Sequence, residues 1–85
     1  MMELKDTVAL MLSDRYEDRF IAEYCQLKIR HDKLDDMITK YCCDELAFEP
    51  KTPLSVLISQ KVYMGIYMET LENCAKLEGI TLPEV

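Results

Sequence analysis

The segment DRYEDRFIAEYCQLKIRHDKLDDMITKY, residues 14–41, decides the fold of this 85-residue chain. It contains neither glycine nor proline, so no residue in it is a strong helix breaker. Its apolar residues recur mostly at steps of three and four, the period of an α-helix with one apolar face. They are Tyr16, Phe20, Tyr24, Leu27, Leu34, Ile38 and Tyr41. We predict one long helix over 14–41, with Ser13 or Asp14 as its N-cap.

A second long helix is predicted over 53–78, where apolar residues again recur with helical spacing. Thr52 and Pro53 suit an N-cap followed by the first helical position, because proline lacks an amide hydrogen that a helix start would leave unpaired anyway. Gly79 suits the left-handed residue that commonly follows a helix end. Residues 42–52 then form the connection between the two helices.

The remaining segments are short. A short helix is predicted over 3–11, and the residues after Gly79 are predicted to be extended. Two long helices of similar length joined by one loop run antiparallel. The sequence therefore predicts an all-α fold: an antiparallel helical hairpin of two long helices with a short N-terminal helix, in a single domain over residues 1–85.

The predicted second helix is apolar on nearly all sides. Besides a wide sector that suits contact with the first helix, it carries a further apolar stripe on its first half. The stripe consists of Leu54, Ile58, Val62 and Ile66. A chain of this size has little bulk with which to bury such a helix, so we predict a homo-oligomeric helical bundle with this stripe at its centre. The alternative is a monomer in which the short N-terminal helix covers the stripe.

Composition excludes several classes of partner. The formal net charge is -6 and the pI is about 4.6, whereas proteins that track duplex nucleic acid or anionic membranes need a broad basic surface. No apolar run approaches the roughly 20 residues of a membrane span, and the N-terminus lacks the basic start of a signal peptide. We expect a cytoplasmic protein that binds neither duplex nucleic acid nor membranes.

The four cysteines do not predict a metal site or a disulfide framework. They contain no C-x-x-C pair, and no histidine cluster accompanies them. They are Cys25, Cys42, Cys43 and Cys74. We interpret them as reduced, structural thiols and expect no cofactor.

One side of the predicted first helix is basic, although the chain as a whole is acidic. Four residues fall there within about 60° of one another at helical spacing. They are Arg15, Arg19, Arg30 and Lys33. Acidic residues lie on the far side, and only Glu23 is close to this strip. The strip borders aromatic residues, so it could bind an anion, and it suits a compact nucleotide in particular. The alternative is a solvated face that pairs with acidic residues of a neighbouring subunit.

The sequence does not predict an enzyme. His31 is the only histidine, and no serine, cysteine or carboxylate is placed beside it in a recognisable nucleophile or metal motif. An interface histidine is the simpler interpretation.

Two motifs resemble a known family. The pattern Y-x-D-R-F-x-A-E-Y-x-Q-L-K-x-R runs from Tyr16 to Arg30, and L-I-S-Q-K-x-Y-M-G-x-Y-x-x-x-L-E runs from Leu57 to Glu72. Together they resemble small helical-hairpin proteins of crAss-like and other tailed bacteriophages. That family is similar in size, layout and phage context to anti-CBASS sponge proteins, which bind cyclic oligonucleotide immune signals in homo-oligomers. The resemblance implies a phage protein of the host cytoplasm that sequesters a cyclic dinucleotide or related nucleotide without cleaving it.

This hypothesis assigns roles to individual residues. Arginines would contact phosphates, aromatic rings would stack on bases, and one lysine would reach across from the second helix. The candidate ligand-binding residues are Arg15, Tyr16, Arg19, Phe20, Arg30, Lys61, Tyr63 and Tyr67. One alternative is an inhibitor or adaptor that docks on a host protein through the apolar side of the second helix. A structural component of the phage particle is a further alternative.

Overall fold

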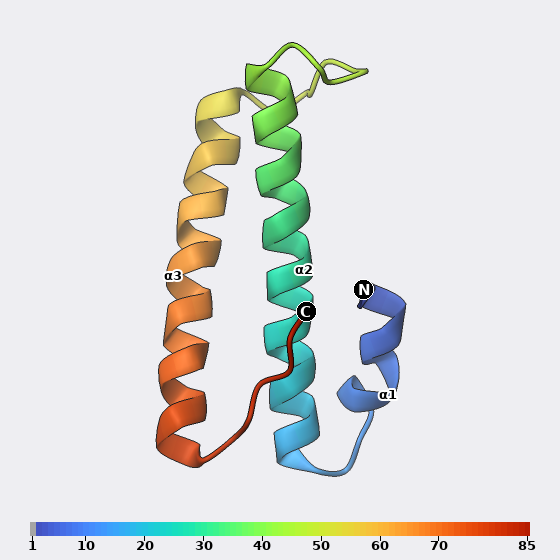
Figure 1. Cartoon of the computed structure of the whole chain (residues 1–85), viewed down its shortest axis with the longest axis vertical. Coiled ribbons are helices and arrows are strands. Elements are labelled where there is room, and N and C mark those ends of the chain that lie inside the picture. The colour runs from blue at the N-terminus through green and yellow to red at the C-terminus, as the bar shows by residue number, and fades with distance from the viewer. Residues whose placement is uncertain (1) are drawn as a thin grey trace.

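The computed structural model describes residues 2–85 and shows an all-helical chain built on two long helices (Figure 1). A 3-10 helix, η1 (Leu4–Thr7), leads directly into a one-turn helix, α1 (Val8–Met11). The long helices are α2 (Tyr16–Cys42) and α3 (Leu54–Glu78). They lie antiparallel and give the molecule extents of 43 × 24 × 19 Å. The predicted hairpin with a short N-terminal helical segment is confirmed.

The start of α2 differs from the prediction. Its N-cap is Arg15, with extended backbone angles, rather than Ser13 or Asp14. The Ser13 hydroxyl instead donates a hydrogen bond to the Asp18 carboxylate at 2.7 Å and accepts one from the Arg15 amide at 3.1 Å. Ser13 therefore stabilises the turn before the helix, which begins two residues later than predicted.

The ends of α3 follow the prediction more closely. Its N-cap is Pro53, one residue later than predicted. Gly79 has a φ of 70°, the left-handed conformation that glycine adopts without a steric penalty. The amide of Ile80 then donates to the carbonyl of Ala75 at 2.9 Å, and the chain turns back toward α2. Gly79 thus ends the helix as predicted.

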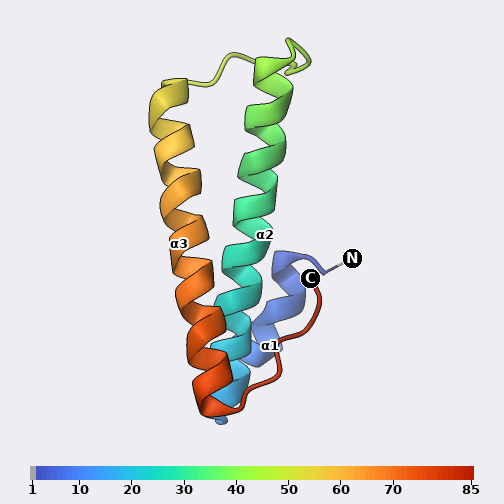
Figure 2. The ribbon, with the colours of Figure 1, turned by 60° about the vertical axis from the view of Figure 1, so that its left-hand side comes forward.

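The core lies between α2 and the second half of α3, and the C-terminal residues cover it. Buried side chains from both helices form one cluster: Phe20, Tyr24, Leu71 and Ala75. Ile80, Leu82 and Val85 pack against this cluster from the C-terminal segment. In Figures 1 and 2 this segment runs back along α2 toward the N-terminus.

The N-terminal segment packs on α2, not on α3. In both ribbon views η1 and α1 lie beside α2, and within residues 2–85 neither approaches α3 (Figure 2). The side chain of Gln26 on α2 donates to the Thr7 hydroxyl at 2.9 Å, and Thr7 is only 1% exposed. The alternative in which this segment covers the apolar stripe of α3 is therefore wrong.

Candidate functional site

A hydrogen bond marks one long edge of the hairpin: the Tyr67 hydroxyl of α3 donates to the Glu23 carboxylate of α2. Residues three, four or seven positions from these two on the same helix lie on the same side. We call the resulting surface the Glu23 edge. It comprises Tyr16, Arg19, Glu23, Arg30, Tyr63 and Tyr67. Most of the candidate ligand-binding residues thus share one edge.

The antiparallel arrangement sets which residues of the Glu23 edge lie at the same height. Moving along α2 from Glu23 to Arg30 corresponds to moving along α3 from Tyr67 toward Tyr63. Arg30 therefore lies within about one helical turn of Tyr63 along this edge, with the guanidinium group on one helix and the phenol ring on the next. A cation and an aromatic face from neighbouring helices form a surface that suits a phosphate linked to a base.

Arg30 is the arginine of this edge that takes part in the fewest contacts. It is exposed, and none of the ion pairs within residues 2–85 involves it. A guanidinium group carries five N–H donors in a planar fork that matches phosphate geometry. Arg30 can therefore bind an anion without first breaking an existing ion pair.

The two arginines near the start of α2 already make polar contacts within the chain. Arg19 donates to the Ser13 carbonyl at 2.8 Å, which fixes its guanidinium group at the corner between α1 and α2. Arg15 forms an ion pair with Glu17 at 3.2 Å, and both side chains are more than half exposed. An exposed pair of this kind contributes little stability, so an anionic ligand can compete for Arg15.

The aromatic residues of the site differ in exposure. Tyr63, Tyr16 and Tyr67 are 71%, 51% and 44% exposed, so each presents ring surface to solvent. Phe20 is only 6% exposed and belongs to the core cluster, with its ring centroid 6.2 Å from that of Tyr16. The structure therefore places Phe20 beneath the site, where it supports Tyr16 and leaves no open face for a base.

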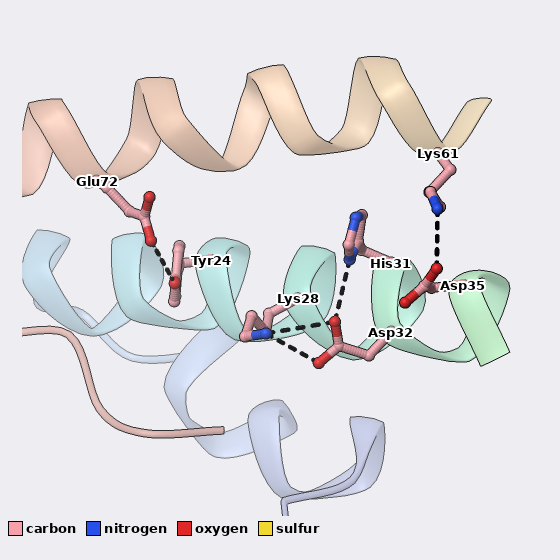
Figure 3. Close-up of polar contacts among 7 residues, drawn as sticks. All are labelled: Tyr24, Lys28, His31, Asp32, Asp35, Lys61 and Glu72. Atoms are coloured by element: carbon pink, nitrogen blue, oxygen red, sulfur yellow. Dashed lines mark hydrogen bonds and ion pairs between the residues drawn. The ribbon is translucent and has the colours of Figure 1, made fainter. Parts of the chain in front are cut away.

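Lys61 lies on the opposite edge of the hairpin, which we call the Asp35 edge. Its ammonium group donates to the Asp35 carboxylate at 2.8 Å (Figure 3). On the same edge the Tyr24 hydroxyl donates to the Glu72 carboxylate at 3.0 Å. The structure therefore does not bring Lys61 together with Arg30 and Tyr63, and it assigns Lys61 to joining the two helices.

Charged groups on the Asp35 edge neutralise one another locally. The hydrogen bond from Lys61 lowers the pKa of Asp35 below its usual value. Asp32 accepts hydrogen bonds from Lys28 at 2.9 Å and pairs with Nδ1 of His31 at 3.0 Å. Burial by itself would raise the pKa of Asp32, but these two partners outweigh it and the pKa is lowered. His31 is thus a partner of Asp32, and Lys28 and Lys61 on the Asp35 edge are both paired with carboxylates.

Tyrosine titration is also shifted by the packing. Burial, and then the hydrogen bond to Glu72, raises the pKa of Tyr24 to about 12. A hydrogen bond to Glu78 is the main cause of a raised pKa at Tyr16. The Tyr24 hydroxyl therefore stays protonated at neutral pH and donates to the Glu72 carboxylate of α3.

A cavity beside α2 lies away from the Glu23 edge. It has a volume of about 370 Å³ and lies between the two chain ends, beside Ile29 and Lys33 of α2. Its charged lining is mainly acidic, from Glu3, Asp32 and Asp36. Lys33 therefore faces carboxylates rather than the other basic residues of the predicted strip, and this cavity does not suit a phosphate.

The described residues contain no cluster of side chains placed to hold a metal ion. Within residues 2–85 no group of three or more His, Cys, Asp or Glu side chains is placed to hold a metal ion. All four cysteines are free thiols: Cys25 is buried, Cys74 is half-buried, and Cys42 and Cys43 are exposed. No helix within residues 2–85 is long and apolar enough to cross a membrane.

The fold and the site define a class: a small all-helical hairpin with a polar and aromatic edge that suits an anionic ligand. A family model confirms a relationship within that class, because the Sequestin model matches residues 14–76, most of the chain. The chain belongs to the Sequestin family. The family name suggests sequestration of a ligand. No curated protein and no solved structure matches the chain.

Glu23 was not predicted as a functional residue. Sequence periodicity placed it close to the basic strip, but only the contact with Tyr67 shows that it lies between the arginines and tyrosines of the two helices. An exposed carboxylate at this point disfavours a ligand that presents only phosphates. It accepts hydrogen bonds, so it suits a ligand that also carries N–H donors, such as a nucleotide base.

Proposed function

We propose that this protein captures a cyclic dinucleotide or related nucleotide signal and holds it without cleaving it. The observation that carries the proposal is the Glu23 edge, where Arg19 and Arg30 lie with the exposed rings of Tyr63 and Tyr67. The family name, with its reference to sequestration, supports the same reading. Guanidinium groups suit the phosphates and tyrosine rings suit the bases.

We propose that the protein is not an enzyme. Sequestration requires only that the ligand binds tightly, so no nucleophile, general base or metal ion has to be positioned. The single histidine is engaged with Asp32 on the Asp35 edge, away from Arg30 and Tyr63. A captured nucleotide would be released from the protein with its own covalent structure unchanged.

The proposed setting is the cytoplasm of a bacterium infected by a phage. The motifs at Tyr16 to Arg30 and at Leu57 to Glu72 resemble proteins of tailed phages, and a phage gains by withholding an immune signal from host effectors. We propose in addition that the protein acts as a homo-oligomer in which subunits share the ligand. The exposed apolar side chains of α3 support this assembly.

A calorimetric titration with a panel of cyclic di- and trinucleotides tests the proposal. We expect saturable binding of at least one member, weakened about tenfold or more by Arg30→Ala, because an ion-paired phosphate contributes roughly 1.5 to 3 kcal/mol. Lys51→Ala is the matched control, since Lys51 is exposed in the connection and lies outside the edge. Flat titrations across the panel, or equal losses in both variants, would contradict the proposal.

A second candidate function is an inhibitor or adaptor that docks on a host protein. The observation that favours it is the same exposed apolar side of α3, which includes Val62 and Ile66 at 51% and 55% exposure. The two functions differ in oligomeric state. A host-protein adaptor keeps this surface free for its partner and is therefore a monomer in isolation.

A further inference from the structure

The side of α3 that faces away from α2 carries almost no charge over half its length. From Leu54 to Met68 the only charged residue is Lys61, and its ammonium group is held by Asp35 of α2. The chain as a whole is 31% charged, with a net charge of -6. An uncharged helix surface of this length is therefore a distinct feature of the molecule.

Nothing else in the described chain covers this surface. The N-terminal segment packs on α2, and the C-terminal segment packs on the core cluster. Six side chains remain between 42% and 71% exposed: Val56, Ile58, Val62, Tyr63, Ile66 and Tyr67. Applied to whole-residue areas of about 150 to 250 Å², these fractions leave roughly 600 Å² open. That equals or exceeds the largest patch on a typical monomer, which is about 300 to 600 Å².

The area fits a second copy of the chain. Two such surfaces together expose roughly 1,200 Å², the lower end of a standard specific interface, and the part contributed by the Tyr63 and Tyr67 rings is covered only when a ligand lies across the pair. The surface also has the repeat of a helix-packing seam, with steps of four and three residues. The seam consists of Ser55, Ser59, Val62, Ile66 and Thr70.

Shape along the seam favours an antiparallel partner. The side chains in the first half of the seam, Ser55 and Ser59, are small. Those in the second half, Ile66 and Thr70, are larger. If two copies pair about a point at Val62, Ser59 of each copy lies level with residue 65 of the other, and the seam residue nearest to that height is Ile66. Small residues then face large ones, as packing without voids requires.

Charge favours the same orientation. The first acidic residue on this side of α3 is Glu69. In the antiparallel register Glu69 lies opposite the neutral Ser55, whereas a parallel pair would bring two Glu69 carboxylates together at a cost in free energy. Antiparallel helices also avoid aligning their dipoles.

We propose that two copies of the chain pair through α3, antiparallel, with a two-fold axis at Val62. Such an axis is perpendicular to both helices and leaves the Glu23 edges of the two copies on the same side of the pair. Tyr63 of each copy then lies next to the axis, and Arg30 lies one helix further out, about 8 to 10 Å away on α2. The site is therefore shared, and each copy supplies half of it.

What this pairing implies for the ligand rests on the proposed function. Two tyrosines near the axis, flanked by two arginines, form a surface with two-fold symmetry. A cyclic dinucleotide with two identical halves has the same symmetry, so both phosphates and both bases would meet equivalent residues. We expect one such nucleotide to bind for every two chains.

Disulfide trapping tests the interface without any ligand. In a background with Cys42→Ser and Cys43→Ser, single Cys substitutions are introduced on α3 and the proteins are oxidised with copper phenanthroline. We expect Val62→Cys to cross-link with itself and Ile66→Cys to remain monomeric alone but to cross-link when mixed with Ser59→Cys. Self-linking of Ile66→Cys would show a parallel pair and overturn the orientation. No cross-link in any sample would overturn the interface.

Sedimentation separates this inference from the proposed function. We expect a dimer for the unsubstituted protein and for Thr39→Glu, which adds a charge on α2, and a monomer for Val62→Glu, with unchanged helical circular dichroism in both variants. The monomeric variant should also bind the nucleotide at least tenfold more weakly. A dimer that binds nothing in the panel would contradict the function alone. A monomeric parent chain would contradict the interface and favour docking on a host protein.

Discussion

At the scale of single residues, the Tyr24 hydroxyl joins the two long helices from within the core. Tyr24 is 6% exposed, and its hydroxyl donates to Glu72 on α3 at 3.0 Å. We expect Tyr24→Phe to lower the free energy of unfolding by about 1 to 2 kcal/mol, because a hydrogen bond to a charged acceptor is lost. Tyr63→Phe is the control, since that ring is 71% exposed. Urea unfolding at one protein concentration measures both, and equal effects would contradict the assignment.

The pH dependence of this contribution has a defined sign. The pKa of Tyr24 is raised from 10.0 to about 12 in the folded chain, mainly by burial and then by Glu72. A raised pKa means that the folded state favours the protonated hydroxyl, so the stabilisation is complete below pH 10 and is lost as the pH rises through about 12. The difference between the unsubstituted chain and Tyr24→Phe should therefore be constant at neutral pH.

Periodicity could place residues on a helix face but not on an edge of the hairpin. The basic and aromatic residues of the Glu23 edge could be identified because they repeat at helical spacing within each of the two helices. Lys61 could not be separated from them, because its edge depends on how α3 is rotated against α2, and only the contact with Asp35 settles that. Phe20 follows Arg19 in the sequence but lies on the side of α2 that faces α3, where packing buries it.

At the scale of the helices, the two glycines are a matched pair. Gly79 has a φ of 70° and Gly65 lies inside α3, and a Cβ atom added at either would meet nothing within 4 Å. We expect Gly79→Ala to destabilise the chain by about 1 kcal/mol, because alanine is strained in the left-handed region. Gly65→Ala should stabilise it by a similar amount, through helix propensity. Thermal unfolding measures both, and shifts of the same sign would contradict this account.

The sequence predicted which helices form better than where they start. Both long helices were identified, since neither contains a proline and their apolar repeats are long. The start of α2 was misplaced because Ser13 makes its side-chain bonds in the preceding turn, with Asp18 as one partner. The packing of the N-terminal segment on α2 rather than α3 depends on contacts such as Gln26 with Thr7, which carry no periodic signal.

At the scale of the whole molecule, one hairpin leaves the Glu23 edge open. Arg30 and Tyr63 are exposed, and the uncharged side of α3 lies next to them. Pairing of two copies through that side would enclose the nucleotide between symmetric halves and remove water from the arginine contacts. Charge-assisted hydrogen bonds are stronger in such a partly dry site, so a chain with a net charge of -6 can still hold an anion.

Capture of a nucleotide without chemical change is tested most directly by one measurement. The protein is incubated with each cyclic dinucleotide of the panel in turn, washed by gel filtration and denatured by heat, and any released nucleotide is identified by liquid chromatography with mass spectrometry. We predict intact cyclic dinucleotide, recovered in full at about one molecule for every two chains. Linear or hydrolysed products, or no nucleotide retained on the protein, would contradict the account.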